Sequence, residues 1–365
     1  MSTDTEEAIC ADCAKRGVLW EDPHFGPDPL KEAVAGEQWL RPSEIYKSPV
    51  IFAADGMPPG GVCLVPGKGT DDGWLMGALA TLAARRPSQL HRLFLSVRGR
   101  RHGVFTLQLF VGEAWVPLTI DDRLPCDKEG SPIHARSGVA GELWVPLVEK
   151  AFAKLLGGYD ALRMGYLPHA LRALTGGVPL TLTARGDAAP ADGGDANPLT
   201  WERLRELHAA GAPVALLRSQ RAEEFLASGG STGGDLEVSG ESYGGLLHGL
   251  AYPVVRTREG KQKGSPREIL LSSPFAPWDE HAAGKSAGSK AVVEDSERGR
   301  WIPFDIAVQM CDVAHAAQGG LGGGGDVSAE LLAELGGFSG PREELPGGGG
   351  VGASTLRLQS SEEWP

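Results

Sequence analysis

The chain has 365 residues, of which 41% are hydrophobic and 22% are charged, and these proportions are ordinary for a soluble globular protein. Its formal net charge of −12 at pH 7 argues against a nucleic-acid-binding function, because the sequence contains no basic stripe to neutralise phosphates. The apolar runs are shorter than the ~18 residues that a membrane-spanning helix needs, so no transmembrane span is expected.

The N-terminal residues 1–17 are polar, and we expect a mobile tail there. They lack the apolar region of a secretory signal, and Ser2 stands where N-myristoylation requires glycine. Cys10 and Cys13 form a CxxC pair without the two further ligands of a zinc knuckle, so we interpret them as free thiols. The cysteines are scattered and odd in number, which indicates a reducing, intracellular compartment.

The stretch 67–84, GKGTDDGWLMGALATLAA, predicts a Gly-rich loop that leads into a helix, because its apolar residues recur at helical spacing. Asp71 or Asp72 can cap this helix, since a carboxylate accepts the unpaired amides of the first turn. A nucleophile often stands at such a helix start, where the helix dipole stabilises a thiolate. That position, directly before Trp74, is Gly73, which has no side chain.

The following segments alternate between strand and helix patterns. Apolar alternation over 104–125, broken at Gly112–Glu113, predicts two antiparallel strands. Helices are expected over 141–162 and 167–177, and Gly176–Gly177 is the expected hinge. Beyond it we expect strands and one short amphipathic helix, over residues 178–185, 201–211, 212–219, 245–257 and 267–275.

These patterns predict an α+β fold in two parts. Residues 18–177 are expected to be mainly helical, and residues 178–317 mainly β. The remaining C-terminal residues, 318–365, are Gly-rich at first and are expected to be a linker or tail.

Eight motifs stand in order along the chain: WEDPHF, WLRPSEI, DDGWLMGALA, GEAWVPLTIDDRLP, ELWVPLVEKAFAKLLGGYDAL, ALTGG, GLAYPV and RWIPF. Together they resemble the protease core of the calpains, which are papain-like cysteine endopeptidases. The resemblance covers residues 18–312. It implies a two-lobe fold, with a helical N-lobe, an antiparallel β C-lobe and an active site in the cleft between them.

The same resemblance implies that the catalytic residues have been replaced. The family's GDCW motif reads DDGW here, which puts Gly73 at the position of the nucleophilic Cys, and the oxyanion-hole Gln falls on Gly67. The family's GHAY motif reads GLAY, with Leu250 at the position of the general base. The NPWG motif reads SPFA, with Ser273 at the position of the orienting Asn. Thiol proteolysis needs a thiolate, a base and an oxyanion donor, so an inactive pseudoprotease is expected.

Such a domain would act as a binding, scaffolding or regulatory module. The resemblance implies a cytoplasmic location, associated with the cytoskeleton or cell cortex, and protein partners that are cytoskeletal, or active calpain relatives and their substrates. The alternative is that the chain is an active calcium-dependent cysteine endopeptidase and that its alignment to the family is wrong around Gly73 and Leu250. In that case Cys63 and His248 are the nearest residues that could supply a thiol and an imidazole.

Calcium is the one metal that the resemblance implies, because family cores bind it through loop carboxylates on each lobe. Calcium requires several oxygen ligands. An acid is expected before ALTGG in the helical lobe, but His169 stands there and argues against that site. For Asp121 and Asp122 we favour a second interpretation, as a pair of acids that cap a turn. The calcium candidates are Asp121, Asp122, Asp279 and Glu280.

Overall fold

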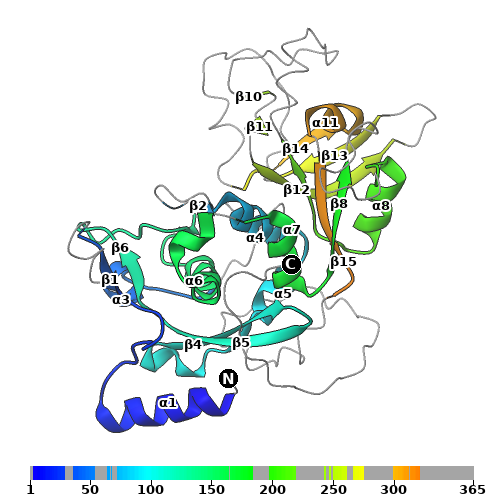
Figure 1. Ribbon diagram of the computed structural model, residues 1–365. Coiled ribbons are helices and arrows are strands. Elements are labelled where there is room, and N and C mark those ends of the chain that lie inside the picture. Colours follow the sequence, from blue (N-terminus) through cyan, green and yellow to red (C-terminus); the bar gives the residue numbers. More distant parts are fainter. Residues whose placement is uncertain are drawn as a thin grey trace.

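Helices and antiparallel strands are both abundant, and the expected α+β fold is confirmed (Figure 1). Buried apolar side chains form two clusters, one mainly from residues 51–174 and the other from residues 182–316. This computed structural model describes residues 3–28, 36–53, 64–65, 67, 72–163, 165–183, 197–218, 242–243, 246–247, 250–260, 266–274, 299–311 and 313–320.

The first cluster is the core of the N-lobe, and helices fill it. Helix α4 is buried on every side, because each residue from Leu75 to Ala83 is buried, and Leu75, Leu79 and Leu82 are all 0% exposed. The main elements are, in chain order, α4 (Gly73–Arg85), β3 (Phe94–Ser96), β4 (Val104–Val111), β5 (Ala114–Asp121), α6 (Trp144–Leu156) and α7 (Leu167–Thr175).

Strands β4 and β5 form the expected hairpin, and β3 joins them in an antiparallel sheet. The chain turns at Gly112, whose φ of +61° lies in the left-handed region that favours glycine. Shorter elements complete this lobe: α1 (Thr3–Arg16), β1 (Gln38–Leu40), α3 (Pro42–Ile45), β2 (Leu64–Val65), α5 (Pro87–Arg92), η1 (Arg98–His102), β6 (Leu124–Cys126), β7 (Arg136–Ser137) and η2 (Tyr159–Arg163).

The second cluster is the core of the C-lobe, and it lies against a fully antiparallel sheet. In the described part of the chain the strand order is β14-β13-β12-β9-β15-β8. The elements are β8 (Val178–Thr183), α8 (Trp201–Ala209), β9 (Val214–Leu217), β10 (Ser242–Tyr243), β11 (Leu246–Leu247), β12 (Ala251–Glu259), β13 (Arg267–Leu271), β14 (Arg300–Pro303), α11 (Phe304–Met310) and β15 (Val313–Gln318).

Along the strands of this sheet, successive side chains point to opposite faces, so they pack alternately into the two cores. Leu216 and Ala316 belong to the C-lobe core, whereas Ala215, Ala251 and Ala317 belong to the N-lobe core. Small residues on the second face let the helices of the N-lobe approach the sheet. Helix α4 packs against β12, and α7 packs against β4 as well as β8 and β15, so these two helices join the lobes (Figure 1).

The structure differs from the sequence expectations at both ends of its described part. Residues 1–17 were expected to form a mobile tail, but Thr3–Arg16 form helix α1, which packs against η1 and β4. Its Glu6 is 4% exposed and accepts hydrogen bonds from Ser96 and Thr106. Strand β15 was not expected, yet it pairs with β8 and β9 inside the sheet.

The expected hinge, Gly176–Gly177, is a tight connection in the structure. Gly176 ends α7 with a φ of +68°, and β8 begins two residues later. Most of the expected C-terminal linker, residues 321–365, lies outside the described residues. The expected domain boundaries therefore stay predictions.

Candidate functional site

Helix α4 begins at Gly73, the residue that the sequence motifs predict at the position of the family's catalytic cysteine. The carbonyl oxygen of Asp72 accepts hydrogen bonds from the amides of Leu75 (2.9 Å) and Met76 (3.1 Å), which forms the first turn. A β-carbon added to Gly73 would meet no atom of the described residues within 4 Å outside its chain neighbours and the helix's own nearby backbone, and φ there lies outside the left-handed region. Neither space nor backbone conformation therefore requires glycine, and the position has room for a side chain that the sequence does not supply.

The residues at the base and orienting positions lie on the C-lobe. Leu250 directly precedes β12, is partly buried and packs against the C-lobe core. Its carbonyl oxygen accepts a hydrogen bond from the amide of Arg218 at 3.3 Å. Ser273 follows β13 and is 7% exposed. The apolar side chain of Leu250 has no nitrogen that could take a proton from a nucleophile.

Two contacts bring these segments of the two lobes together. A β-carbon on Gly77, one turn after Gly73, would lie 2.8 Å from Cβ of Ala251, the residue after Leu250. The amide of Leu64 donates a hydrogen bond to the carbonyl oxygen of Pro274 at 2.8 Å. The structure therefore places the start of β12, next to Leu250, against α4, and places the residue after Ser273 against β2.

Some of the candidate residues lie outside the described part of the chain. These are Cys63 and His248, considered for a substitute catalytic pair, and the calcium candidates Asp279 and Glu280. Gly67, at the oxyanion position, is described and partly buried.

Thiols on other described elements are poor nucleophile candidates. Burial raises the pKa of Cys126 to about 11, and burial followed by the nearby Glu6 carboxylate raises the pKa of Cys10. Both shifts disfavour the thiolate, which is the reactive form. Cys126 lies on β6 and Cys10 on α1, so neither belongs to the helix that begins at Gly73.

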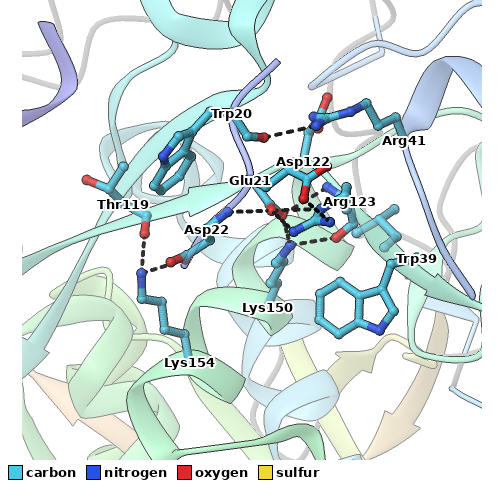
Figure 2. Close-up of polar contacts among 12 residues, drawn as sticks. Trp20, Glu21, Asp22, Trp39, Arg41, Thr119, Asp122, Arg123, Lys150 and Lys154 are labelled. Atoms are coloured by element: carbon cyan, nitrogen blue, oxygen red, sulfur yellow. Dashed lines mark hydrogen bonds and ion pairs between the residues drawn. The ribbon is translucent and has the colours of Figure 1, made fainter. Parts of the chain in front are cut away.

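Asp121 lies in a buried ion-pair network rather than in an open loop, and its partners Lys150 and Arg123 are labelled in Figure 2. It is 0% exposed, pairs with Lys150 and with Arg123 (2.9 Å), and accepts a hydrogen bond from the amide of Asp22 at 2.8 Å. Burial acts to raise the pKa of Asp121, but the Lys150 ammonium and these hydrogen bonds hold it below its ordinary value. Cationic side chains of the protein therefore already neutralise the charge of this carboxylate.

Asp122 is bound in a similar way, to a different cation. It pairs with the Arg41 guanidinium, which also donates a hydrogen bond to the carbonyl oxygen of Trp20 at 3.0 Å (Figure 2). Burial raises the pKa of Asp122, and the Arg41 charge opposes this only in part. No group of three or more His, Cys, Asp or Glu side chains suited to a metal ion occurs among the described residues. The geometry favours a structural role, and metal binding by Asp121 and Asp122 stays a prediction.

The network joins the segment of residues 20–40, here called the N-terminal arm, to the body of the N-lobe. Lys154 of α6 pairs with Asp22 at 2.6 Å and donates to the carbonyl oxygen of Thr119 on β5 (Figure 2). Trp39 packs edge to ring against Phe25 and Tyr159, and the ring of Phe25 is tilted by 40° against that of Tyr159, with ring centroids 5.8–6.2 Å apart. The arm is thereby held by both charge and aromatic contacts.

Sequence reasoning missed Glu149, which is 0% exposed in the middle of α6. Its Oε2 accepts a hydrogen bond from the amide of Ala135 at 3.0 Å, and burial, followed by the nearby Asp72 carboxylate, raises its pKa well above the ordinary value. Asp72 was expected to cap α4, but its side chain makes no capping hydrogen bond. An acid within the apolar run LWVPLVEKAF is the signal that could have indicated a buried carboxyl group.

The helical lobe, the antiparallel second lobe and the helix start between them define the core of a papain-like cysteine peptidase. A family model described as "Calpain family cysteine protease" matches residues 20–298, and the chain belongs to this family. In the described residues no helix is both long and apolar enough to cross a membrane.

Among its relatives, "Calpain-type cysteine protease DEK1" of Arabidopsis thaliana is 33% identical over 265 residues, which are 69% of this chain and 11% of that protein. The protein of the same name from Zea mays is 32% identical over 276 residues, 72% of this chain and 11% of the relative. "Calpain-12" of Homo sapiens is 36% identical over 193 residues, 49% of this chain and 26% of the relative. The chain thus spans a small part of the length of these relatives.

Proposed function

We propose that this calpain-family domain is catalytically inactive and acts as a binding, scaffolding or regulatory module. One observation carries the proposal: α4 begins at Gly73, with open space where a nucleophile's side chain would lie. Leu250 at the base position supports it, because an aliphatic side chain cannot accept a proton. Removing a single triad member costs on the order of 10⁴ to 10⁶ in kcat in a serine protease, and here the nucleophile itself is missing.

The family's scaffold is retained around the altered positions. The start of β12 packs against α4, and apolar side chains fill the cores of both lobes. A surface that binds extended peptides in active relatives can bind them here without cleavage, which is what a scaffold or a decoy for active calpains requires. We propose protein partners in the cytoplasm, from the cytoskeleton or from active relatives and their substrates.

The test is a proteolysis assay on the full chain. Purified protein is incubated with casein, with calcium or with a chelator, and in parallel with an electrophilic probe for activated thiols. We expect no casein turnover and no calcium-dependent labelling. The variant Gly73→Cys should gain labelling at residue 73, read by peptide mass spectrometry, yet should not cleave casein because Leu250 cannot act as its base.

Two outcomes separate the proposal from its alternative. Calcium-dependent casein hydrolysis by the wild-type chain, abolished by Cys63→Ala, would establish an active endopeptidase with a substituted nucleophile. If the chain is inactive, a pull-down with the same chain as bait should capture cytoskeletal proteins or active calpains, and the decoy role further predicts slower casein cleavage by an added active calpain.

A further inference from the structure

Two arginines at the C-terminal end of α4 reach the C-lobe. Arg85 is the last residue of this helix, and Arg86 follows it as the capping residue. Nη2 of Arg85 donates a hydrogen bond to the carbonyl oxygen of His208 at 2.9 Å, and its Nη1 donates a longer one to that of Val255 on β12 at 3.4 Å. Nε2 of His208 lies 3.1 Å from the same carbonyl oxygen of Val255. The end of α4 is thus tied to both α8 and β12.

Arg86 binds the chain at the end of α8. Its Nε donates a hydrogen bond to the carbonyl oxygen of Gly211 at 2.6 Å, and its Nη2 donates to that of Ala210 at 3.1 Å. Gly211 has a φ of +70°, and a β-carbon there would lie 2.0 Å from Nη2 of Arg86. The glycine therefore leaves the room that the guanidinium occupies.

The acceptors on α8 stand at its C-terminal end, where a cation is favoured. His208 belongs to the last turn of this helix, and Ala210 is its capping residue. The last carbonyl groups of a helix lack donors within the helix, and the helix dipole places partial negative charge there. An arginine side chain keeps its charge and presents five N–H donors in a rigid plane, so it can bind two carbonyl oxygens at once. The N-lobe therefore supplies the cationic cap of a C-lobe helix.

A second contact between the lobes lies farther back along the same helix. Gly77 faces Ala251 at the start of β12, where a β-carbon on the glycine would lie 2.8 Å from that of the alanine. From Gly77 to Arg85 the helix rises by about 12 Å, at 1.5 Å per residue. A single contact would leave a pivot about which the lobes could turn, whereas two separated contacts on one helix oppose such a rotation.

We propose that Arg85 and Arg86 form a clamp that locks the two lobes in one orientation. This arginine clamp consists of the hydrogen bonds from the two side chains to α8, to the residues at its end and to β12. While the clamp is closed, α4 cannot turn relative to the C-lobe sheet, so Gly73 at the start of the helix and Leu250 before β12 keep one relative position. The inference goes beyond the proposed function, because it holds whether or not the chain cleaves peptides.

Residual dipolar couplings of the backbone amides in the full chain test the clamp, because they report how each lobe is oriented in a weakly aligned solution. Two lobes that move as one body have the same alignment tensor. We expect a single tensor for the wild type, which fits the amides of α4, α6 and α7 in the N-lobe and those of β8, β9, β12 and β15 in the C-lobe. In the double variant Arg85→Gln/Arg86→Gln the lobes should need separate tensors, with the alignment of one lobe reduced relative to the other.

Arg172→Gln is the matched control, because Nη2 of Arg172 also donates to a backbone carbonyl, that of Gly112 at 2.8 Å, but within the N-lobe. This variant should keep one common tensor, and separate tensors in it would refute a specific role of the clamp. If Arg85 and Arg86 only cap α8 locally, the double variant changes the couplings of α8 while the C-lobe strands still share the tensor of the N-lobe. That result overturns the clamp, and so does a wild type whose lobes already need separate tensors.

A single variant provides the test if the double variant does not fold. Arg86→Gln removes the bonds to the residues at the end of α8 and keeps those of Arg85. It should give a smaller divergence of the two tensors, in the same direction. One common tensor in Arg86→Gln would then count against the clamp.

Discussion

The backbone of Gly77 on α4 lies so close to Ala251 on β12 that a β-carbon on the glycine would be 2.8 Å from that of the alanine. It would also lie 3.0 Å from Cδ1 of Leu167. Real β-carbons do not approach this closely, so only glycine fits without a shift in the backbone. The contact fixes the distance between the helix that begins at Gly73 and the strand that follows Leu250.

Replacing this glycine should therefore separate the lobes. We expect Gly77→Val to lower the free energy of unfolding by about 1–3 kcal/mol or more, because overpacking forces the backbones apart. Gly73→Ala is the control on the same helix, since its β-carbon enters open space, and it should change stability by less than about 1 kcal/mol. Urea denaturation measures both. Equal effects of the two substitutions would contradict the close packing at Gly77.

The buried pair Lys150–Asp121 predicts a large cost when one partner is removed. Both side chains are 0% exposed, and Lys150→Met leaves the Asp121 carboxylate with a buried charge that has lost one cation. We expect a loss of about 3–5 kcal/mol in unfolding free energy. The control is Lys128→Met, because Lys128 pairs with Glu129 at 3.7 Å with side chains 77% and 63% exposed. That exposed pair should contribute at most about 1 kcal/mol, so similar losses from both variants would count against the network.

Helix α1 should detach when Glu6 is replaced. Its carboxylate accepts hydrogen bonds from the hydroxyl of Ser96 (2.8 Å), the amide of Gly99 (3.1 Å) and the hydroxyl of Thr106. We expect Glu6→Ala to cost about 1–3 kcal/mol and to make the chain near Gly17 accessible to protease, because buried donors lose their acceptor. Glu7→Ala changes an exposed neighbour on the same helix and should behave as wild type. Protection that persists in Glu6→Ala would show that other contacts hold α1.

A buried histidine predicts loss of stability in acid. Burial lowers the pKa of His91 to about 4, below the value of 6.5 expected in the unfolded chain. As pH falls, the unfolded state binds the proton first, so the contribution of His91 is complete above pH 6.5 and is lost towards pH 4. His91→Gln should flatten the pH dependence of the urea midpoint in this window, whereas His24→Gln, at an exposed residue, should not. If the urea midpoint of His91→Gln still falls steeply between pH 6.5 and pH 4, other groups cause the loss of stability.

Calcium should not act through Asp122. Its carboxylate already pairs with Arg41, so a cation would have to displace a guanidinium. We expect any difference in melting temperature between calcium and chelator to be the same for the wild type and for Asp122→Asn, because a ligand stabilises only the state that it binds. A calcium-dependent shift that disappears in Asp122→Asn would instead make this carboxylate a calcium ligand.

Local patterns in the sequence predicted much of this architecture. The β4–β5 hairpin and helices α6, α7 and α8 occur where apolar periodicity and glycines predicted them. Family membership was evident from eight short motifs, and it is confirmed. The family's motifs predict Gly73 and Leu250 at triad positions, and this assignment stays a prediction. Only the structure shows that no atom of the described residues fills the space beside Gly73.

The missed features depend on contacts between distant residues. Helix α1 has few apolar side chains, and its buried Glu6 bonds to residues about ninety positions later. Strand β15 is rich in alanine, which has low β propensity, and it forms because β8 and β9 both pair with it. Asp72 has a typical capping position, but its side chain is buried and makes no capping hydrogen bond. No pattern within a short window contains this information.

The place of β15 in the sheet also determines when the sheet can close during protein synthesis. This strand is the last described element to be translated. Among the described strands, β15 is nevertheless the one partner with which β8 pairs. The ribosome therefore completes the N-lobe while β8 and β9 of the nascent chain still present open edges, which can pair wrongly with other chains. Chaperone binding during that interval would protect the emerging sheet, and a stop codon upstream of Val313 would leave it permanently unclosed.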